Sequence, residues 1–239
     1  QQHWLDDFTL FSAIARKWGT NWQGWPKDLK NRDSNALKIS REHLKDEIDF
    51  YGFLQWQFEQ QWRQLRRKAK STGVGLIGDL PIFISHGSCD VWANQKLFLL
   101  KKNGSPSHVA GCPPDVFNKN GQLWGNALYR WPALETQKYR WWIRRFERLF
   151  ELFDVVRIDH FIGLHHYWKI PAGSNTAKSG RWERASGDKM LRSVIAKFGD
   201  HRLIAEDLGL MTPAVHTLRQ KHKIPGTRVL QFAFSTGQG

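Results

Sequence analysis

The sequence contains little cysteine and no long apolar run. Its only two cysteines, Cys89 and Cys112, stand outside any CxxC spacing and away from a histidine cluster at zinc-ligand intervals. This argues against a disulfide scaffold and a structural zinc site, and it favours a reducing compartment, with the cytoplasm as the default. No segment approaches the ~20 apolar residues that a membrane helix needs. We therefore expect no membrane partner.

Several sequence signatures of other enzyme classes are also missing. No GxGxxG or Walker-type loop follows a predicted strand, which weakens a nucleotide-binding interpretation, and no GxSxG surrounds a serine. Three histidines (His160, His165 and His166) follow one predicted strand, but their spacing fits no standard metal-ligand set. A serine hydrolase is therefore disfavoured, and no metal is expected.

Acidic residues are outnumbered, and the formal net charge is +14 with a pI of about 10. Such a charge makes nucleic acid a candidate partner. The basic residues, however, are spread over predicted helical faces such as 62–70 and 141–150, without an RGG run or a basic tail. Solvated helix faces are the favoured explanation. We therefore expect no nucleic acid partner. Salt-dependent binding of DNA or RNA would contradict this expectation.

Helices dominate the first part of the sequence, and alternating elements follow. Over residues 1–70, one helix ends at Gly19, and a longer one runs from an N-cap at Ser40 to a stop at Gly73. A short strand is predicted over 74–85 and a loop-rich segment over 86–133. Helices then alternate with strands, the helices at 137–153, 187–199 and 212–222 and the strands at 154–161, 202–207 and 229–234. This order predicts parallel strands joined by helical crossovers, in an α/β layer or barrel.

The segment VVRIDHFIGLHHYWKIPAG, at 155–173, ends a strand on a carboxylate. Arg157 points from the strand to the same side as Asp159, because side chains alternate along a strand. A carboxylate beside a fixed cation stays ionised, which suits a nucleophile. His160 follows directly and is a candidate hydrogen-bond partner for a substrate hydroxyl.

A second strand end, LIAEDLG, supplies Glu206 after the apolar Ile204 and Ala205, which favour a raised pKa. Two carboxyl groups ~5–5.5 Å apart are what a retaining glycosidase needs, and neighbouring strands provide that spacing. A structural alternative stays open. In it, Asp159 forms an ordinary ion pair with Arg157, while Glu206 and Asp207 cap the following helix.

Two further segments carry candidate residues. Asp79 lies at a junction of a strand with Pro81, where it is placed to hold loops together. The loop at 110–131 combines Pro and Gly turns with aromatics that have little local core, among them Phe117 and Trp124. Thirteen tryptophans occur in the chain, most of them expected in the core. Those in this loop are candidates for stacking on sugar rings.

Four segments together resemble the 4-alpha-glucanotransferases, the amylomaltases or disproportionating enzymes of glycoside hydrolase family 77. They are GDLPIFISHGSCDVWAN, AGCPPDVFNKNGQLWGNALYRW, VVRIDHFIGLHHYWKIPAGSNTAKSGRW and LIAEDLGLMTPAVHTLRQKHKIPGTRVLQFAF. The resemblance runs over nearly the whole chain. It implies a (β/α)₈ TIM-type barrel with helical insertions. It also implies transfer of α-1,4-glucan segments from a maltooligosaccharide or glucan donor to a glucose or maltooligosaccharide acceptor, without a cofactor.

The resemblance also assigns roles to individual residues. Asp159 corresponds to the nucleophile and Glu206 to the general acid/base. The remaining positions are expected to bind substrate: Arg157 and His160 beside the cleaved bond, Phe117 and Trp124 in a loop over the glucan, and Asn126, Asp79 and Asp207.

Departures from the family pattern concern the site and the ends. The family usually has Arg at the position of Ile162, and many members have an aromatic residue at that of Val116. A third family carboxylate is expected beyond Gly239, and early strands before Gln1. Residues 1–239 are thus expected to form the central part of the barrel domain, with 1–70 a mainly helical insertion, both ends truncated and the isolated chain incomplete. A non-catalytic glucan-binding derivative is the alternative.

Overall fold

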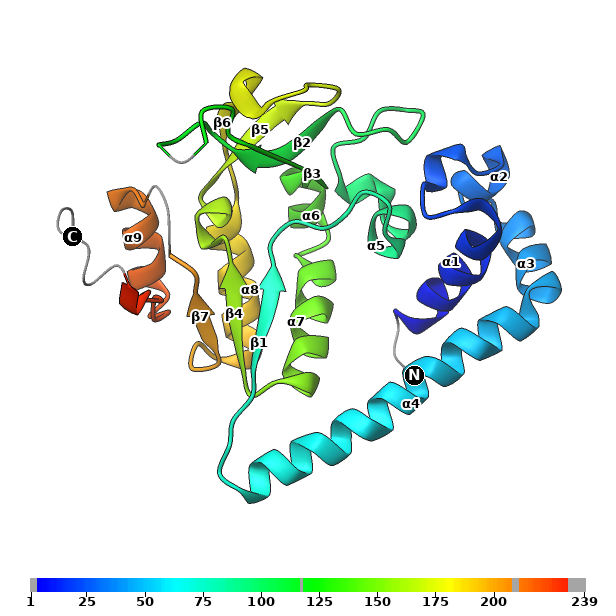
Figure 1. Ribbon diagram of the computed structural model, residues 1–239, viewed down its shortest axis with the longest axis horizontal. Helices are drawn as coiled ribbons and strands as arrows, with labels where there is room; N and C mark the ends of the chain where they lie inside the picture. The colour runs from blue at the N-terminus through cyan, green and yellow to red at the C-terminus, as the bar shows by residue number, and fades with distance from the viewer. Residues whose placement is uncertain (1–3, 117, 208–210, 232–239) are drawn as a thin grey trace. The chain divides into compact units, whose positions relative to one another are not determined.

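The computed structural model describes residues 4–116, 118–207 and 211–231 of the chain. The chain divides into two compact units (Figure 1). The first unit consists of residues 1–72, 83–130 and 169–181, and the second of residues 73–82, 131–168 and 182–239. No helix in the described part is long and apolar enough to cross a bilayer.

A parallel three-stranded sheet forms the centre of the second unit. Its strands are β1 (Ile77–Pro81), β4 (Val155–Asp159) and β7 (Leu203–Ala205), in the order β1-β4-β7. Asp79 stands opposite Arg157, and Ile158 opposite Ala205. The parallel arrangement confirms the prediction from the alternating elements, although each strand is shorter than predicted.

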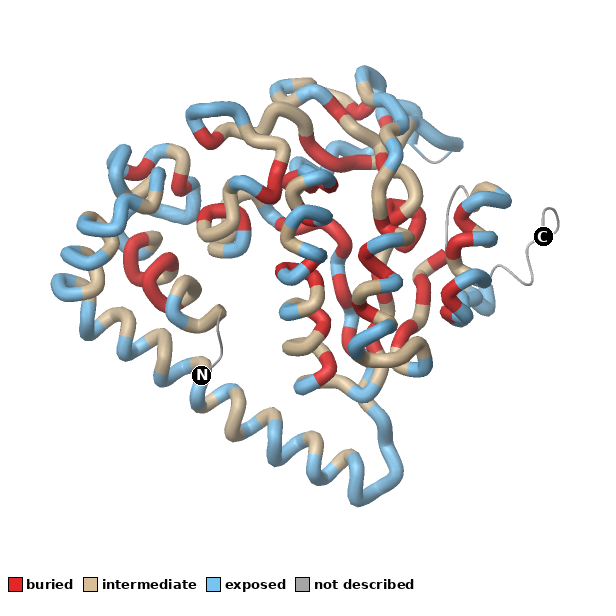
Figure 2. The backbone as a smooth tube through the Cα atoms, turned by 180° about the vertical axis from the view of Figure 1, so that it is seen from behind, coloured by how far each residue is buried: buried red, intermediate tan, exposed pale blue. Residues whose placement is uncertain are grey.

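Helices cover this sheet with large apolar side chains. The helix α7 (Arg140–Leu152) contacts β1 and β4, and it buries Trp142, Phe146 and Phe150. The helix α8 (Gly187–Phe198) packs on α7, and Figure 2 shows buried backbone along the strands and these helices. The unit also contains α6 (Trp131–Thr136), the 3-10 helix η3 (Phe161–Leu164), most of β6 (Arg181–Arg184) and α9 (Pro213–Lys221).

The first unit begins with helices, of which the first agrees with the prediction and the second does not. The helix α1 (Leu5–Trp18) ends at Gly19, with φ at 77°, as predicted. The long helix predicted from Ser40 is instead two helices, α3 (Ser34–His43) and α4 (Lys45–Ser71). The Asp33 carboxylate accepts hydrogen bonds from the backbone N–H groups of Asn35 and Ala36, so α3 starts before Ser40. Shorter elements are η1 (Trp22–Gly24) and α2 (Lys27–Lys30).

The segment predicted to be loop-rich, 86–133, contains regular structure. It forms α5 (Cys89–Ala93), η2 (Gln95–Leu97) and the antiparallel pair of β2 (His108–Cys112) and β3 (Gln122–Ala127). These strands belong to a four-stranded sheet of order β3-β2-β5-β6, with β5 at His166–Pro171, and η4 (Ala177–Ser179) follows β5. A Cβ at Gly111 would lie 2.1 Å from the carbonyl oxygen of Gln122. This glycine therefore serves close strand packing and not a loop.

The sheets are partial, and the described residues form no closed barrel. The fold is a mixed α/β one with a parallel sheet, which is coarser than the predicted (β/α)₈ barrel. The strand predicted over 229–234 is wrong where it can be checked, because residues 230 and 231 belong to a 3-10 turn. Residues 232–234 lie outside the described residues.

We predict that Gly187→Ala in the full-length protein destabilises the second unit. A Cβ at Gly187 would lie 2.2 Å from the backbone carbonyl oxygen of Leu164, so the start of α8 would have to move. Overpacking of this kind costs about 1–3 kcal/mol, which a thermal unfolding scan measures as a lower midpoint. Gly52→Ala is the matched control, because nothing lies within 4 Å of its Cβ and alanine favours a helix interior. A Gly187→Ala midpoint equal to that of the control would contradict this packing.

Candidate active site

Arg157 links two carboxylates on the exposed face of the parallel sheet. Val156 and Ile158 point into the core, so Arg157 and Asp159 project to the opposite side. The guanidinium donates from Nε to Asp79 Oδ1 at 2.9 Å and from Nη2 to Asp79 Oδ2 at 2.7 Å. The same Nη2 donates to Asp159 Oδ1 at 3.1 Å. The predicted pairing of Arg157 with Asp159 is confirmed, but the bidentate partner of Arg157 is Asp79.

The ion pair with Asp79 fixes the charge on Arg157. Hydrogen bonding to Asp79 raises the pKa of Arg157 above its usual value, and the charges of Asp79, Asp159 and Glu206 act in the same direction. The guanidinium is therefore a permanent cation at the carboxyl end of β4. It stands between two carboxylates that would otherwise repel each other across neighbouring strands.

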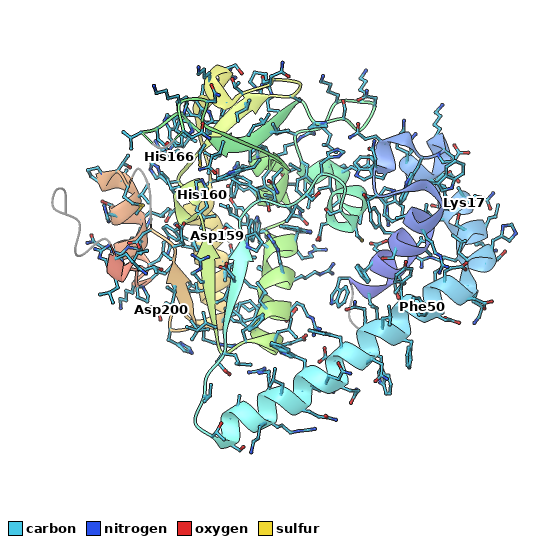
Figure 3. The ribbon with its side chains drawn as sticks, in the orientation of Figure 1. Lys17, Phe50, Asp159, His160, His166 and Asp200 are labelled. Atoms are coloured by element: carbon cyan, nitrogen blue, oxygen red, sulfur yellow. The ribbon has the colours of Figure 1, made fainter. Side chains whose placement is uncertain are left out.

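Glu206 directly extends the pairing of β7 with β4. Its backbone N–H donates to the carbonyl oxygen of Ile158 at 2.9 Å, and its own carbonyl oxygen accepts from Phe161 at 3.1 Å. Its side-chain Oε2 accepts from the backbone N–H of His160 at 2.8 Å. Asp159 thus ends β4 and Glu206 directly follows the neighbouring parallel strand β7, at the same edge of the sheet, and Figure 3 shows Asp159 and His160 there.

The surroundings of Glu206 favour a protonated carboxyl group. Burial raises the pKa of Glu206, and the negative charge of Asp159 adds to this. The hydrogen bond from His160 and the charge of Arg157 act in the opposite direction, but the net shift is upward. This is the direction predicted from the apolar residues before Glu206, and a raised pKa suits a proton donor.

His160 adopts an unusual backbone conformation. Its φ and ψ angles are 50° and 52°, in the left-handed region. This conformation costs free energy for any residue other than glycine. This turn aims its N–H at Glu206. Burial lowers the pKa of the His160 imidazole to about 4, and the nearby His166 acts in the same direction. The ring is therefore neutral at physiological pH.

Asp207 lies in the interior, on the opposite side of the strand end from Glu206. It is 4% exposed, and its carboxylate accepts from the backbone N–H of Thr227 at 2.7 Å. Arg219 Nε lies 3.3 Å from it. A Cβ at Gly226 would come within 2.2 Å of its Oδ2. The suggestion that Glu206 and Asp207 cap the next helix is wrong, because Thr212 is the N-cap of α9.

The predicted sugar platform belongs to the first unit. Trp124 on β3 is 38% exposed, and its indole N–H donates to Gln122 Oε1 at 2.9 Å. Its ring centroid lies 6.4 Å from that of Phe83. Asn126 is half-buried on the same strand, and Phe117 lies outside the described residues. The structure thus gathers Asp79, Arg157, Asp159, His160 and Glu206 within the second unit.

The two departures from the family pattern differ in their surroundings. Val116 is 91% exposed, whereas Ile162 is 3% exposed within η3. Ile162 is thus an interior residue, and the cation beside Asp159 is Arg157. As for metals, the part of the chain that the structure describes contains no group of three or more His, Cys, Asp or Glu residues arranged to hold an ion.

The 4-alpha-glucanotransferase family, glycoside hydrolase family 77, matches the chain over residues 1–239. The chain belongs to this family. It is 46% identical to a 4-alpha-glucanotransferase of Thermus thermophilus over 98% of its own length and 47% of the relative's. It is 45% identical to one of Aquifex aeolicus, over 97% and 48% of the two chains.

Family membership also extends to the fold. The structure of amylomaltase from Streptococcus agalactiae in complex with acarbose superposes with a TM-score of 0.93 at 35% identity, over 97% of this chain and 47% of that one. The chain therefore spans about half the length of the family relatives that it matches. The resemblance drawn from the four sequence segments is confirmed.

Sequence reasoning missed two contacts of this site. The hydrogen bond between Asp79 and Arg157 depends on the pairing of β1 with β4. The sequence signal for it is an acidic residue and a basic residue at corresponding positions of two predicted strands. The bond from the His160 N–H to Glu206 depends on a left-handed residue, and local sequence gives no clear signal for one here.

We predict that Asp207→Asn lowers the stability of the full-length protein. The amide leaves Arg219, which is largely buried, without its counter-charge, and breaking such a pair costs about 3 kcal/mol. Chemical denaturation monitored by circular dichroism measures the loss. Asp46→Asn on the exposed side of α4 is the control, expected to stay within about 0.5 kcal/mol of the unmodified protein. Equal stabilities of the two variants would contradict the structural contribution of the pair.

Proposed function

We propose that the full-length protein is a retaining 4-alpha-glucanotransferase. It takes a maltooligosaccharide or α-1,4-glucan as donor and passes a glucan segment to glucose or another maltooligosaccharide. The observation that carries the proposal is the placement of two carboxyl groups at one edge of the sheet. Asp159 ends β4 beside the cation of Arg157, and Glu206, whose pKa is raised, follows the neighbouring parallel strand β7. Family membership supports the same conclusion.

In this proposal the two carboxyl groups divide the chemistry between them. Asp159 attacks the anomeric carbon while Glu206 gives its proton to the oxygen of the breaking glycosidic bond. The shortened glucan leaves with that proton, and the donor segment is held as an ester of Asp159. Glu206, now a carboxylate, removes the proton from the acceptor's 4-hydroxyl. The acceptor oxygen displaces Asp159, so the anomeric configuration is retained.

The other residues support these steps. Arg157, held by Asp79, keeps a positive charge beside the nucleophile. The neutral imidazole of His160 is suited to exchange a hydrogen bond with a sugar hydroxyl. For Trp124, Asn126 and Phe117 we propose contacts with the glucan. Asp207 is buried, so we propose that it positions the end of β7 without touching substrate.

The proposal extends to the whole fold and its setting. In the full-length protein the parallel sheet is part of a closed (β/α)₈ barrel, and residues 1–70 are a helical insertion in it. The reaction needs no cofactor, because Glu206 carries out both proton transfers and Asp159 holds the donor segment as an ester. A reducing compartment such as the cytoplasm suits the two free thiols, Cys89 and Cys112.

A non-catalytic glucan-binding protein is the second candidate. Ile162, buried where the family usually has Arg, is the observation that favours it. Incubation of the full-length protein with maltotriose separates the two candidates, because transfer gives glucose together with longer maltodextrins. Binding of acarbose without any turnover would instead support the binding protein, and hydrolysis to glucose alone would contradict transfer.

Asp159→Asn is expected to lower the rate of transfer by at least about a thousandfold, since an amide cannot form the ester intermediate. Chromatography of the maltotriose products measures the rate. The variant should still bind acarbose, because the change is isosteric. Asp200→Asn, in the turn before β7, is a control of the same chemistry and should keep full activity. Substantial activity of Asp159→Asn would remove the assignment of the nucleophile.

The pH dependence of transfer should report the protonation of Glu206. Burial raises its pKa, so the proton donor persists above the usual pH range of a carboxylic acid and is lost as pH rises through the raised value. The alkaline limb of kcat/KM should therefore lie above the ordinary Glu pKa. The contribution of Glu206 to folding stability likewise falls as pH rises through that value. Glu206→Gln should abolish the limb together with most of the activity, and a limb that persists would assign it to another group.

A further inference from the structure

Four aromatic side chains form a cluster in the second unit, next to the candidate active site. We call His165, His166, Trp168 and Trp182 the His–Trp cluster. The ring of His166 meets that of Trp182 edge to face, with centroids 4.5 Å apart. Trp168 contacts Trp182 in the same manner at 5.3 Å. Strands β5 and β6 carry these residues, except for His165, which directly precedes β5.

Trp182 is held firmly and yet remains accessible. Its two edge-to-face contacts fix the orientation of the indole, while 37% of the residue stays exposed. A tryptophan of the core would bury its whole surface, as Trp142 does. An ordered aromatic ring with an open side is the form in which proteins present apolar area to a ligand.

The two histidines of the cluster supply matching polar groups. Their Nδ1 atoms lie 2.7 Å apart, so one donates and the other accepts. Burial lowers the pKa of both rings, which keeps them neutral. A neutral donor at Nδ1 carries a lone pair at Nε2, and a neutral acceptor at Nδ1 carries a proton at Nε2. The pair therefore offers one hydrogen-bond acceptor and one donor beside the indole.

The cluster is linked to Glu206 through His160. His166 lies close enough to His160 for its protonation to lower the pKa of the His160 ring, and the backbone N–H of His160 donates to Glu206 Oε2. Figure 3 shows Asp159 at the end of β4, with His160 and His166 following beyond it. In retaining transfer the acid/base contacts the leaving oxygen first and the acceptor hydroxyl afterwards. Side chains around Glu206 thus lie where the acceptor sugar must approach.

We propose that the His–Trp cluster binds a glucose ring of the acceptor, with the ring lying on Trp182 and its hydroxyls paired with the two imidazoles. A glucose ring has an apolar face of C–H groups and a rim of hydroxyls, which matches a flat indole flanked by one donor and one acceptor. The inference rests on the proposed transferase function and assigns its acceptor specificity to residues outside the catalytic pair.

The test uses the full-length protein with Trp182→Ala, Trp182→Phe and the control Trp18→Ala, another exposed tryptophan. Maltose is varied as acceptor with α-maltosyl fluoride as donor, and the burst of fluoride released in the first turnover reports the first half-reaction alone. Trp182→Ala should raise the KM for maltose about tenfold, or ~1.4 kcal/mol, and leave fluoride release within about twofold. Trp182→Phe and Trp18→Ala should stay within about threefold in KM.

Two results would overturn the inference. One is an unchanged KM for maltose in Trp182→Ala. The other is a Trp182→Phe variant as impaired as Trp182→Ala, since a retained aromatic ring should still stack. If the unmodified protein shows no transfer, the proposed function fails, and calorimetry with maltotriose then tests the cluster separately. Weaker binding in Trp182→Ala alone would support the sugar site, and equal binding would reject it.

Discussion

One guanidinium group holds the charge balance of the sheet's carboxyl edge. Arg157 binds Asp79 on one neighbouring strand and Asp159 on its own, and its positive charge also reaches Glu206 on the other side. One cation among three carboxyl groups cannot neutralise all of them. Burial is the main cause of the raised pKa of Glu206; the charge of Asp159 adds to it and the charge of Arg157 opposes it. Parallel pairing of β1, β4 and β7 is what brings Arg157 and the three carboxyl groups together.

Much of this edge could be predicted from the sequence, because its signals are local. Alternation in β4 places Arg157 and Asp159 on one face, and the helices between the strands require parallel pairing. The same local reasoning failed at α3 and α4, where the Asp33 cap starts a helix earlier than Ser40 does. It failed again at β2 and β3, where Gly111 serves close strand packing. The Asp33 cap is a local signal that competes with Ser40, whereas the contact of Gly111 with Gln122 depends on the pairing of two strands.

Contacts across long stretches of sequence explain the remaining differences. Asp207 follows Glu206 directly and is expected from the resemblance to bind substrate, but its carboxylate turns inward to Arg219 and Thr227. The inward direction depends on the segment that follows α9, and no periodicity within LIAEDLG encodes it. The barrel is a comparable case. The chain spans about half the length of its relatives, and its described residues form only partial sheets, whereas closing a sheet into a barrel depends on the full set of strands.

His160 also has a consequence for how this region can change in sequence. Its left-handed backbone would be relaxed by glycine or asparagine, which adopt that conformation at lower cost. Either replacement would keep the N–H that reaches Glu206 and would remove the buried imidazole. A relaxed backbone and a buried imidazole therefore favour different residues at position 160. Relaxing the backbone at this position would remove the buried imidazole, so that stability and the side chain kept at this edge oppose each other.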